Sequence, residues 1–293
     1  MEYRDFGNTG IKVSVLGFGA GHIGSEEMDE KGAEKLLNTV LDLGITLIDT
    51  ARAYGLSEKR IGKYLSHRRE DFILSTKVGY NFEWKEDWSY DATMGTIDQA
   101  LQLMKTDYLD IVHLHSCDKS VLEKGEAFAA LLKAKEQGKI RTAAYSGENE
   151  ALDFAIESGC FGSLQCSVNI CDQRGISTLL PKATHRGMGV IAKRPIANAP
   201  WRYSARPVGH YSAEYWDRMQ VMHIDPHGLD WNELAIRFTG FAPGVDTCIA
   251  GTANPDHLKE NLSHLEKGPL EESLLQHLRS EFNAHDHGWI GLI

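Results

Sequence analysis

Short apolar segments alternate with amphipathic segments along nearly the whole chain, and this alternation constrains its fold most strongly. The apolar runs predict strands at 15–19, 46–50, 72–77, 109–115, 141–146, 163–166, 189–192 and 247–250. Helical periodicity predicts helices at 28–43, 57–65, 92–104, 121–137, 150–158, 176–184, 230–238 and 256–265, the second with Ser57 as its N-cap. Eight strand–helix units in series close most readily into a barrel, because their crossovers are right-handed.

The predicted fold class is therefore α/β, a (β/α)8 TIM barrel formed by residues 1–293 as a single domain. A length of 293 residues is ordinary for such a barrel. The first fourteen residues read as two short strands around a turn at residues 8–10. The alternative is a doubly wound open sheet, which needs a G-x-G-x-x-G turn between its first strand and a helix. Gly17, Gly19, Gly21 and Gly24 match that turn only in part, and no helix begins at them, so we reject this alternative.

Charge and cysteine usage exclude several classes of protein. The net charge is −10, so we expect neither nucleic acid nor an anionic membrane surface as a partner. The opening MEYRDFGNTG is too polar for a signal peptide, and no apolar stretch approaches the length of a membrane span. Five cysteines without a C-x-x-C pair indicate reduced thiols and a cytoplasmic protein. A monomer is compatible with the sequence, which does not reveal the oligomeric state.

Ionisable side chains lie at the ends of three predicted strands. Asp49, Lys77 and His115 end the second, third and fourth strands, and Tyr54 follows Asp49 by five residues. Burying such groups is costly unless they contact one another. The carboxyl ends of parallel strands meet at one face of a barrel, where catalytic sites are assembled. We therefore expect these four side chains to form one site.

The combination of a tyrosine and a lysine suggests a proton donor. Free tyrosine titrates near pH ~10, so by itself it is a poor acid at neutral pH. A nearby ammonium favours the phenolate and lowers that pKa toward the working range. Asp49 would keep Lys77 charged and in place. The alternative is an ordinary buried ion pair of Asp49 and Lys77 with Tyr54 and His115 as packing residues.

Two long connections that follow strands are rich in aromatic residues. Residues 78–91 contain Tyr80, Phe82, Trp84, Trp88 and Tyr90. Residues 195–229 contain Trp201, Tyr203, Tyr211, Tyr215 and Trp216. Both connections are expected on the catalytic face, where these side chains either form the walls of a substrate pocket or pack the loops onto the barrel.

At these motifs the chain resembles the aldo-keto reductases. The matching segments are YRDFGNTGIKVSVLGFGA, IDTARAYG, STK, LDIVHLH, GKIRTAAYSG, LQCSVN and GTANPDHLKENL, which occur in the family's order and at compatible spacing. The resemblance implies a (β/α)8 barrel whose bottom is closed by the N-terminal hairpin. It also implies nicotinamide-dependent reduction of an aldehyde or ketone, or oxidation of an alcohol. Tyr54 would be the general acid, His115 would orient the carbonyl, and Lys77 with Asp49 would lower the pKa of the tyrosine.

The resemblance also implies cofactor contacts near the nicotinamide. Ser146 and Gln165 would bind the carboxamide, although many relatives have an asparagine where Gly147 stands. Relatives often have a tyrosine against the nicotinamide face, and here Lys193 and Arg194 occupy that region. Either the lysine stem covers the ring and its charge reaches a phosphate, or the two cations form a solvent-facing pair.

At the adenosine end, the helix beginning near Pro255 would present its N-terminus to a phosphate. Many relatives have a lysine where Gly251 stands and an arginine where His257 stands, and these clamp a 2′-phosphate. The other candidate contacts are Thr252, Asn254, Glu260 and Asn261. NADP is the cofactor that the resemblance implies, and NAD is possible because both clamping cations are missing.

Two other functions are compatible with parts of the sequence. His113 and His115 form an H-x-H pair that could bind a metal, as in barrel hydrolases. The four strands that follow end in Ser146, Cys166, Lys193 and Ala250, which leaves such a metal short of ligands, so we expect no metal at this site. The other alternative is a reductase-like protein without turnover that senses a nucleotide or binds a partner.

Overall fold

The computed structural model describes residues 1–81 and 83–293, and its centre is a closed barrel of eight parallel strands within that part of the chain. The strands are β3 (Leu16–Gly19), β4 (Leu47–Asp49), β5 (Ile73–Val78), β6 (Leu109–His115), β7 (Ile140–Ser146), β8 (Ser163–Ser167), β9 (Gly189–Lys193) and β10 (Thr247–Ala250). They follow one another around the barrel in chain order, and β10 pairs with β3 to close it. The predicted (β/α)8 fold is confirmed, and every predicted strand lies within one residue of an observed one at each end.

The N-terminal hairpin closes one end of the barrel. Strands β1 (Tyr3–Asp5) and β2 (Lys12–Ser14) pair antiparallel, and the backbone N–H of Asn8 donates to the carbonyl of Gly187 at 2.7 Å, next to the start of β9. Hairpin and strand side chains share one buried interior cluster of Phe6, Ile11, Val13, Leu47, Ile111, Ala144, Ile191 and Ile249. Because this apolar plug fills the end where the strands begin, the opposite end is the one open for a site.

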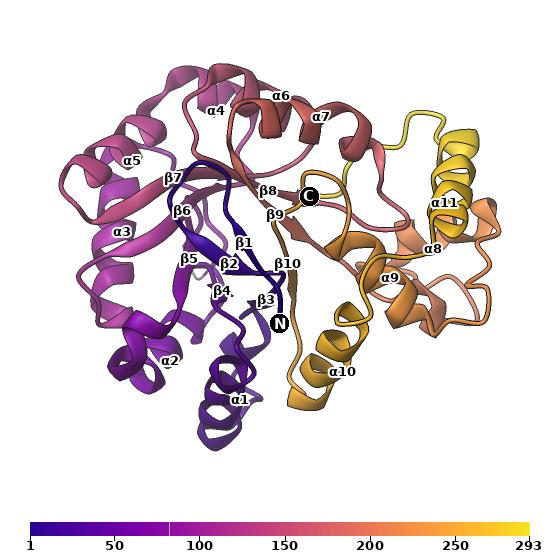
Figure 1. Cartoon of the computed structure of the whole chain (residues 1–293). Coiled ribbons are helices and arrows are strands. Elements are labelled where there is room, and N and C mark those ends of the chain that lie inside the picture. The colour runs from indigo at the N-terminus through magenta and orange to yellow at the C-terminus, as the bar shows by residue number, and fades with distance from the viewer. Residues whose placement is uncertain (82) are drawn as a thin grey trace.

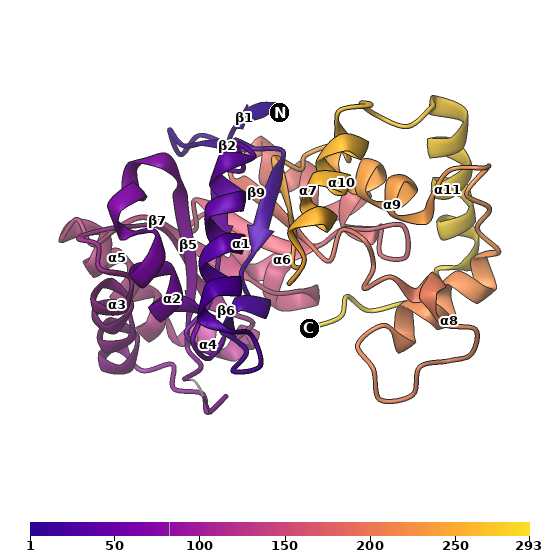
Figure 2. The ribbon, with the colours of Figure 1, turned by 90° about the horizontal axis from the view of Figure 1, so that it is seen from below.

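Helices surround the barrel on the outside (Figure 1). They are α1 (Glu30–Asp42), α2 (Ser57–Tyr64), α3 (Tyr90–Met104), α6 (Asn149–Ser158), α7 (Arg174–His185), α9 (Trp231–Gly240) and α10 (Pro255–Leu265), with 3-10 turns at His22–Gly24, Ser66–Asp71 and Pro200–Arg202. Both ribbon views show α8 (Ala213–Met222), α9, α10 and α11 (Glu272–His285) together on one side of the barrel (Figure 2). None of the helices in the described residues is both long and apolar enough to cross a membrane.

Two details of the helix predictions were wrong. The segment 121–137 is two helices, α4 (Lys119–Lys124) and α5 (Glu126–Glu136), because Gly125 adopts a left-handed φ of +76° between them. Ser57 is the first residue of α2 rather than its N-cap. Its hydroxyl accepts from Thr50 Oγ1 and donates to the carbonyl of Ala20, which ties the helix to the barrel instead.

Two helices were not predicted at all. Helix α8 lies inside the connection 195–229, and its Tyr215 is completely buried, so this connection is partly core rather than only a surface loop. Helix α11 follows the last strand–helix unit and buries Leu278 and Phe282. Its apolar positions are few, so the periodic signal is weak.

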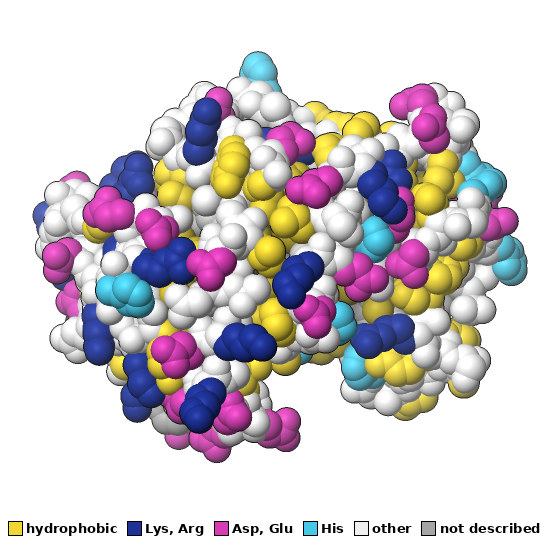
Figure 3. Space-filling view, turned by 60° about the horizontal axis from the view of Figure 1, so that its bottom comes forward, with side chains coloured by type: hydrophobic (Ala, Val, Ile, Leu, Met, Phe, Trp, Pro, Cys, Tyr) yellow, Lys and Arg dark blue, Asp and Glu magenta, His cyan; other side chains and the backbone are white. Residues whose placement is uncertain are grey.

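Charged side chains of both signs are mixed on one face of the molecule (Figure 3). On the face drawn in Figure 3, basic and acidic side chains alternate and form no broad patch of one sign. The five cysteines are unbridged, and Cys160 is the exposed one.

Candidate active site

The ends of β4 and β5 bring a buried ion pair together at the open end of the barrel. Lys77 Nζ donates to Asp49 Oδ2 at 2.5 Å and to the carbonyl of Thr50 at 2.8 Å. Both charged side chains are 2% exposed. Burial by itself would lower the pKa of Lys77, but the Asp49 carboxylate and the neighbouring Tyr54 outweigh it, so the pKa is raised. The ammonium is therefore a permanent charge within the barrel mouth at ordinary pH.

Tyr54 and His115 lie directly beside this ion pair. The Tyr54 ring centroid is 5.0 Å from Lys77 Nζ and 5.9 Å from the His115 ring, which it meets edge-on. Burial, followed by the charges of Lys77 and Lys193, holds the pKa of His115 well below its usual range. The imidazole is thus neutral at neutral pH, with one N–H to donate. The structure brings all four predicted residues into one cluster.

A second layer of polar side chains supports Asp49 from inside the barrel. Ser75 Oγ donates to Asp49 Oδ1 at 2.8 Å, and His113 Nε2 lies 3.2 Å from the same hydroxyl. Strand register explains the contact, because Asp49 pairs with Ser75 across β4 and β5. Both carboxylate oxygens are therefore held, one by Lys77 and one by Ser75. Ser75 was not singled out from the sequence, although a serine two residues before the lysine on a strand points to the same side.

Aromatic side chains form one wall of the site. Tyr80 lies 5.7 Å and Trp84 lies 5.8 Å from the His115 ring, and Trp84 is 6.3 Å from Tyr54. Trp88 packs edge-on against Tyr80 at 5.3 Å. Residues 78–91 were predicted either to form a wall of the site or to pack onto the barrel. Tyr80 and Trp84 form the wall, and Trp88 packs behind them. Phe82 lies outside the described residues.

A long pocket of about 740 Å³ extends from this cluster across the barrel mouth. One end is lined by Asp49 and Tyr54, and the other by Gly251, Thr252, His257, Glu260 and Asn261. Of the second aromatic connection, Trp201, Tyr203 and Tyr211 line the pocket. Tyr215 is buried instead, and Trp216 donates to the carbonyl of Tyr203 at 3.0 Å. The shape suits an extended molecule that lies across the strand ends.

Ser146 and Gln165 lie beside each other at the level of His115. The register pairs His115 with Ser146 and Ser146 with Gln165, and Ser146 Oγ donates to Gln165 Oε1 at 3.0 Å. Gln165 is 1% exposed, and its Nε2 has no partner among the described residues. A buried amide donor without a partner is costly, so this position suits a ligand that carries an acceptor such as a carboxamide oxygen.

Lys193 and Arg194 are not a solvent-facing pair, so that interpretation was wrong. Lys193 Nζ lies 3.1 Å from Glu148 Oε1, with exposed fractions of only 14% and 6% for the two side chains. Burial lowers the pKa of Lys193, and the Glu148 carboxylate works against it. Arg194 donates to Ser167 Oγ at 3.0 Å and to the carbonyl of Leu292. Both residues still line the pocket. Glu148 was missed, although a carboxylate two residues after a strand end is a visible signal.

The far end of the pocket is formed at the N-terminus of α10. Asn254 is the N-cap of this helix and accepts from the backbone N–H of Asp256 at 3.0 Å. Thr252 Oγ1 accepts from the N–H of Asn254 at 3.0 Å and lies 3.0 Å from His257 Nδ1. A Cβ on Gly251 would lie 3.2 Å from the carbonyl oxygen of Gly19, so the backbone is close here. Glu260 and Asn261 follow on the same helix.

The C-terminal tail, residues 286–293, crosses the barrel mouth on this same side. Arg218 on α8 donates to the carbonyl of Ile290 at 2.6 Å and to that of Cys171 at 3.1 Å. Asn149 donates to the carbonyl of Gly291 at 3.0 Å and accepts from its N–H at 2.8 Å. Together with Arg194, these contacts hold the tail next to the Lys193–Glu148 pair.

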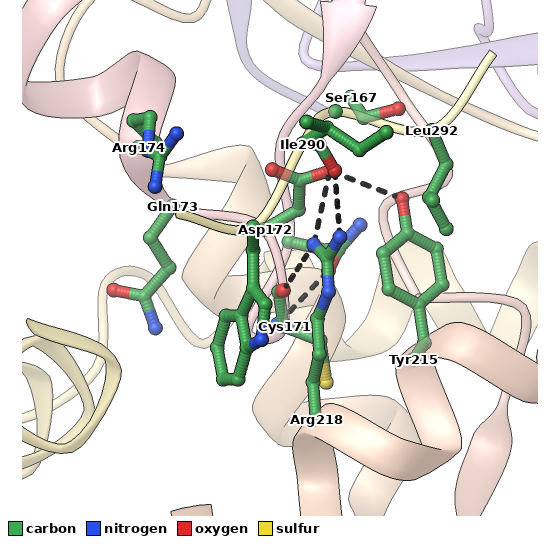
Figure 4. Close-up of polar contacts among 12 residues, drawn as sticks. Ser167, Cys171, Asp172, Gln173, Arg174, Tyr215, Arg218, Ile290 and Leu292 are labelled. Atoms are coloured by element: carbon green, nitrogen blue, oxygen red, sulfur yellow. Dashed lines mark hydrogen bonds and ion pairs between the residues drawn. The ribbon is translucent and has the colours of Figure 1, made fainter. Parts of the chain in front are cut away.

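Beneath the tail, Asp172, Tyr215 and Arg218 converge (Figure 4). Tyr215 Oη donates to Asp172 Oδ2 at 3.3 Å, and Arg218 Nη1 lies 3.7 Å from the same oxygen. Burial, reinforced by the negative charge of Glu148, raises the pKa of Asp172 to about 7, and Arg218 and Tyr215 only partly oppose it. This buried acid was not singled out from the sequence, because its partners are more than forty residues away.

The two histidines of the H-x-H pair lie in different surroundings. His113 is fully buried against Ser75 inside the barrel, whereas His115 faces Tyr54 and the aromatic wall. In the part of the chain that the structure describes, one set of three potential ligand residues comes close enough to hold an ion, and it consists of Asp230, Glu260 and His264. Neither histidine of β6 belongs to it.

Comparison with known proteins agrees with this geometry. The family model described as the aldo/keto reductase family matches residues 15–280. L-galactose dehydrogenase from Arabidopsis thaliana is 29% identical over 282 residues, which cover 90% of this chain and 88% of the relative. D-threo-aldose 1-dehydrogenase from a Pseudomonas species is 24% identical, covering 87% of this chain and 90% of the relative. The holo form of an aldo-keto reductase from Bacillus halodurans has a TM-score of 0.85 and 29% identity, and the match covers 96% of both chains. The family model spans most of the chain, and therefore this protein belongs to the aldo/keto reductase family.

Proposed function

We propose that this protein is an NADP(H)-dependent oxidoreductase that reduces an aldehyde or ketone, or oxidises the corresponding alcohol, with Tyr54 as the general acid or base. The observation that carries the proposal is the cluster at the barrel mouth. Lys77 Nζ is held 2.5 Å from Asp49 Oδ2 and 5.0 Å from the Tyr54 ring, with the His115 ring beside it. In this proposal residues 1–293 form a single barrel domain that carries the whole site.

The roles follow from charge and from hydrogen-bonding capacity. The substrate oxygen gains negative charge as the carbonyl is reduced, so a proton must reach it from the protein. The phenol of Tyr54 donates this proton. The Lys77 ammonium stabilises the phenolate that remains, and Asp49 keeps the ammonium in place. Neutral His115 donates a hydrogen bond that fixes the carbonyl oxygen, and Tyr80 and Trp84 exclude water from one side.

The residues of the pocket fit a nicotinamide dinucleotide. When bound, that cofactor supplies or accepts the hydride. The unpaired Nε2 of buried Gln165, next to Ser146, suits the carboxamide. Lys193 and Arg194 also line the pocket, and their positive charges would suit the phosphates. The positive end of the α10 dipole, with the side chains of Thr252, Asn254 and His257, would meet the adenosine phosphate, and Glu260 and Asn261 would meet the adenine.

The names of the relatives, rather than the shape of the pocket, indicate which substrates to test first. Two of them are named as dehydrogenases of sugars, L-galactose and D-threo-aldoses. Polyhydroxylated aldehydes and their cyclic forms therefore belong in the first substrate panel, together with simple aldehydes and ketones. Reduced thiols, as the unbridged cysteines suggest, fit a cytoplasmic enzyme.

The decisive experiment is Tyr54→Phe, assayed with this panel against NADPH, NADH and their oxidised forms. Removing one phenolic oxygen should lower turnover by about 10²–10⁴-fold and leave nucleotide affinity and melting temperature nearly unchanged. Turnover within a few-fold of the wild type would overturn the role of Tyr54. A wild-type protein that binds nucleotide yet turns over no member of the panel would favour the nucleotide-sensing alternative.

A further inference from the structure

Beside the pocket end that is lined by Gly251 and Thr252, helices α9 and α10 bring together three side chains that can ligate a metal. Glu260 and His264 are four residues apart on α10 and therefore share one face of it. Asp230 is the N-cap residue of the neighbouring helix α9. One potential ligand atom from each of the three lies within 4.8 Å of the other two. Asp230 and Glu260 are exposed, and His264 is buried.

His264 is the member of the group that ordinary packing does not explain. It is 8% exposed, and both of its ring nitrogens are buried without a hydrogen-bond partner. Nε2 lies 3.8 Å from Glu260 Oε1, and Nδ1 lies 3.5 Å from Glu233 Oε2. These distances are too long for hydrogen bonds but are short enough for attraction if the ring is charged. A buried imidazole with two unpaired nitrogens is costly, and a metal bound to one of them would remove part of that cost.

Glu233 is placed as an orienting carboxylate. Arg237 Nη1 and Lys267 Nζ hold it at 2.7 and 2.5 Å, so it cannot move freely toward another partner. An Nδ1–H directed at Glu233 would leave the Nε2 lone pair directed at Glu260. Metal-bound histidines commonly have such a carboxylate behind them, because it fixes the tautomer and the ring orientation. The two ring nitrogens of His264 thus have different roles: Nδ1 faces an orienting carboxylate, and Nε2 is left to bind a metal.

We propose that Asp230, Glu260 and His264 bind a divalent cation of the zinc class. One imidazole nitrogen and two carboxylate oxygens are a donor set that suits Zn²⁺ or Co²⁺ and not Mg²⁺ or Ca²⁺, which take oxygen ligands. Tetrahedral ligands at ~2.1 Å from a metal are separated by roughly 3.4 Å, close to the 3.8 Å between His264 and Glu260. Asp230 Oδ1 already accepts the helix N–H groups of Asn232 and Glu233, so Oδ2 is the oxygen for the metal. Glu260 also lines the pocket and is the residue proposed to meet the adenine, so metal binding is measured on protein free of nucleotide. The metal proposal itself rests on these three side chains and not on the oxidoreductase function.

The experiment is a metal titration of the full chain, stripped with EDTA, by calorimetry with Zn²⁺ and by absorption spectroscopy with Co²⁺. Cys160 is an exposed thiol that would itself bind zinc, so every variant carries Cys160→Ser. We expect one Zn²⁺ per chain and Co²⁺ bands of nitrogen and oxygen ligation. Both His264→Ala and Glu260→Gln should weaken binding at least tenfold, while Mg²⁺ and Ca²⁺ should not compete.

The matched control is His285→Ala, because His285 and Glu281 form another pair four residues apart on α11, with Nδ1 and Oε2 3.8 Å apart. That pair belongs to no such group of three among the described residues and should contribute nothing to binding. Glu260→Gln and Asp230→Asn keep the side-chain volume, so they carry the test if His264→Ala fails to fold. A wild type with no specific site would overturn the proposal and leave His264 as a packing residue beside Glu233 and Glu260. So would equal weakening by His285→Ala.

Discussion

The two sides of the barrel mouth hold their charged groups in different ways. On the side of β4 to β6, Lys77 and Asp49 extend from adjacent strands, and the ion pair is 2.5 Å long. On the side of β9 and β10, Lys193 reaches Glu148 at 3.1 Å, and Arg194 is bound to the carbonyl of Leu292 at the end of the chain. The first side is fixed by the register of the sheet, whereas the second depends on loops and on the tail.

The backbone reflects the same difference. Arg194, Ala197, Asn198 and Ala199 all have left-handed φ angles between +47° and +56°, in the loop that follows β9. Non-glycine residues adopt this region at a cost, so surrounding contacts must hold the loop in place. We expect the chemistry to reside on the rigid side and the selection of cofactor and substrate on the adaptable side.

The largest predicted effect is on the rigid side, from Lys77→Met. Turnover should fall by about 10²–10⁴-fold, because the phenolate that forms when Tyr54 gives up its proton loses the cation that stabilises it. Asp49 is left as a buried charge whose remaining partner is Ser75, which should cost about 3–5 kcal/mol of unfolding free energy. Steady-state kinetics and urea unfolding measure the loss of turnover and the loss of stability.

The double variant Lys77→Met with Asp49→Asn separates the two effects. It removes the unpaired charge, so it should recover much of the lost stability while activity stays low. If activity returned together with stability, Lys77 would be a structural residue rather than the partner of Tyr54.

The rigid side could be predicted from the sequence because each of its residues follows from a local pattern. An apolar run that ends in Asp49, Lys77 or His115 identifies both the strand and the position of the side chain at the barrel mouth. The eight strand positions were predictable for the same reason. Ser75 and His113 were not assigned to the site, because their contacts depend on the register between strands, which the pattern does not specify.

The adaptable side could not be predicted because its contacts join segments that are far apart in the sequence. The position of Glu148 just after a strand end marks it as a candidate, but the sequence does not show that Lys193 is its partner or that Arg194 binds the carbonyl of Leu292. The sequence did not reveal helix α8, because it lies in a connection whose aromatic residues suggested either pocket walls or loop packing, and its Tyr215 is part of the core. Gly125 divides a helix that the periodicity predicts as continuous, because one left-handed residue does not disturb the apolar pattern.

The next effect concerns Asp172, beneath the tail on the adaptable side. Its pKa is raised to about 7 from an ordinary value of 3.8, mainly by burial. Between these values the folded protein holds one more proton than the unfolded chain, so this group lowers stability as pH rises from about 4 to 7. One pKa unit corresponds to about 1.4 kcal/mol, and the effect is of a few kcal/mol. In Asp172→Asn the free energy of unfolding should therefore change less with pH between about 4 and 7. Urea unfolding at several pH values measures this dependence. An unchanged slope would show that Asp172 is already ionised in the folded protein at pH 4.

A smaller effect is expected when the tail is loosened by Asn149→Gly. Asn149 has a φ of +56°, which glycine adopts without strain, so the change removes only the two hydrogen bonds to Gly291. About 1–2 kcal/mol of local stability should be lost. Hydrogen exchange of residues 286–293 should become faster while that of β4 to β6 stays the same. A fall in kcat of more than a few-fold would mean that the two sides are coupled.

The smallest effect concerns the end of the pocket farthest from Tyr54, where a 2′-phosphate would be bound. His257 is exposed there, beside Thr252, and the substitution His257→Arg adds one full positive charge at this position. An exposed ion pair is worth about 0.5–1 kcal/mol, so NADPH should bind roughly two- to fivefold tighter while NADH is unchanged. Gly251→Lys is a poorer test, because its Cβ would press on the carbonyl oxygen of Gly19 at 3.2 Å.

The matched control is His67→Arg, which makes the same charge change in the exposed turn before β5, at the opposite end of the barrel. Fluorescence titration gives the affinities of both variants for NADPH and NADH, which are compared with those of the wild type. Equal tightening of NADPH and NADH by His257→Arg, or an equal gain from His67→Arg, would place the 2′-phosphate elsewhere on the adaptable side.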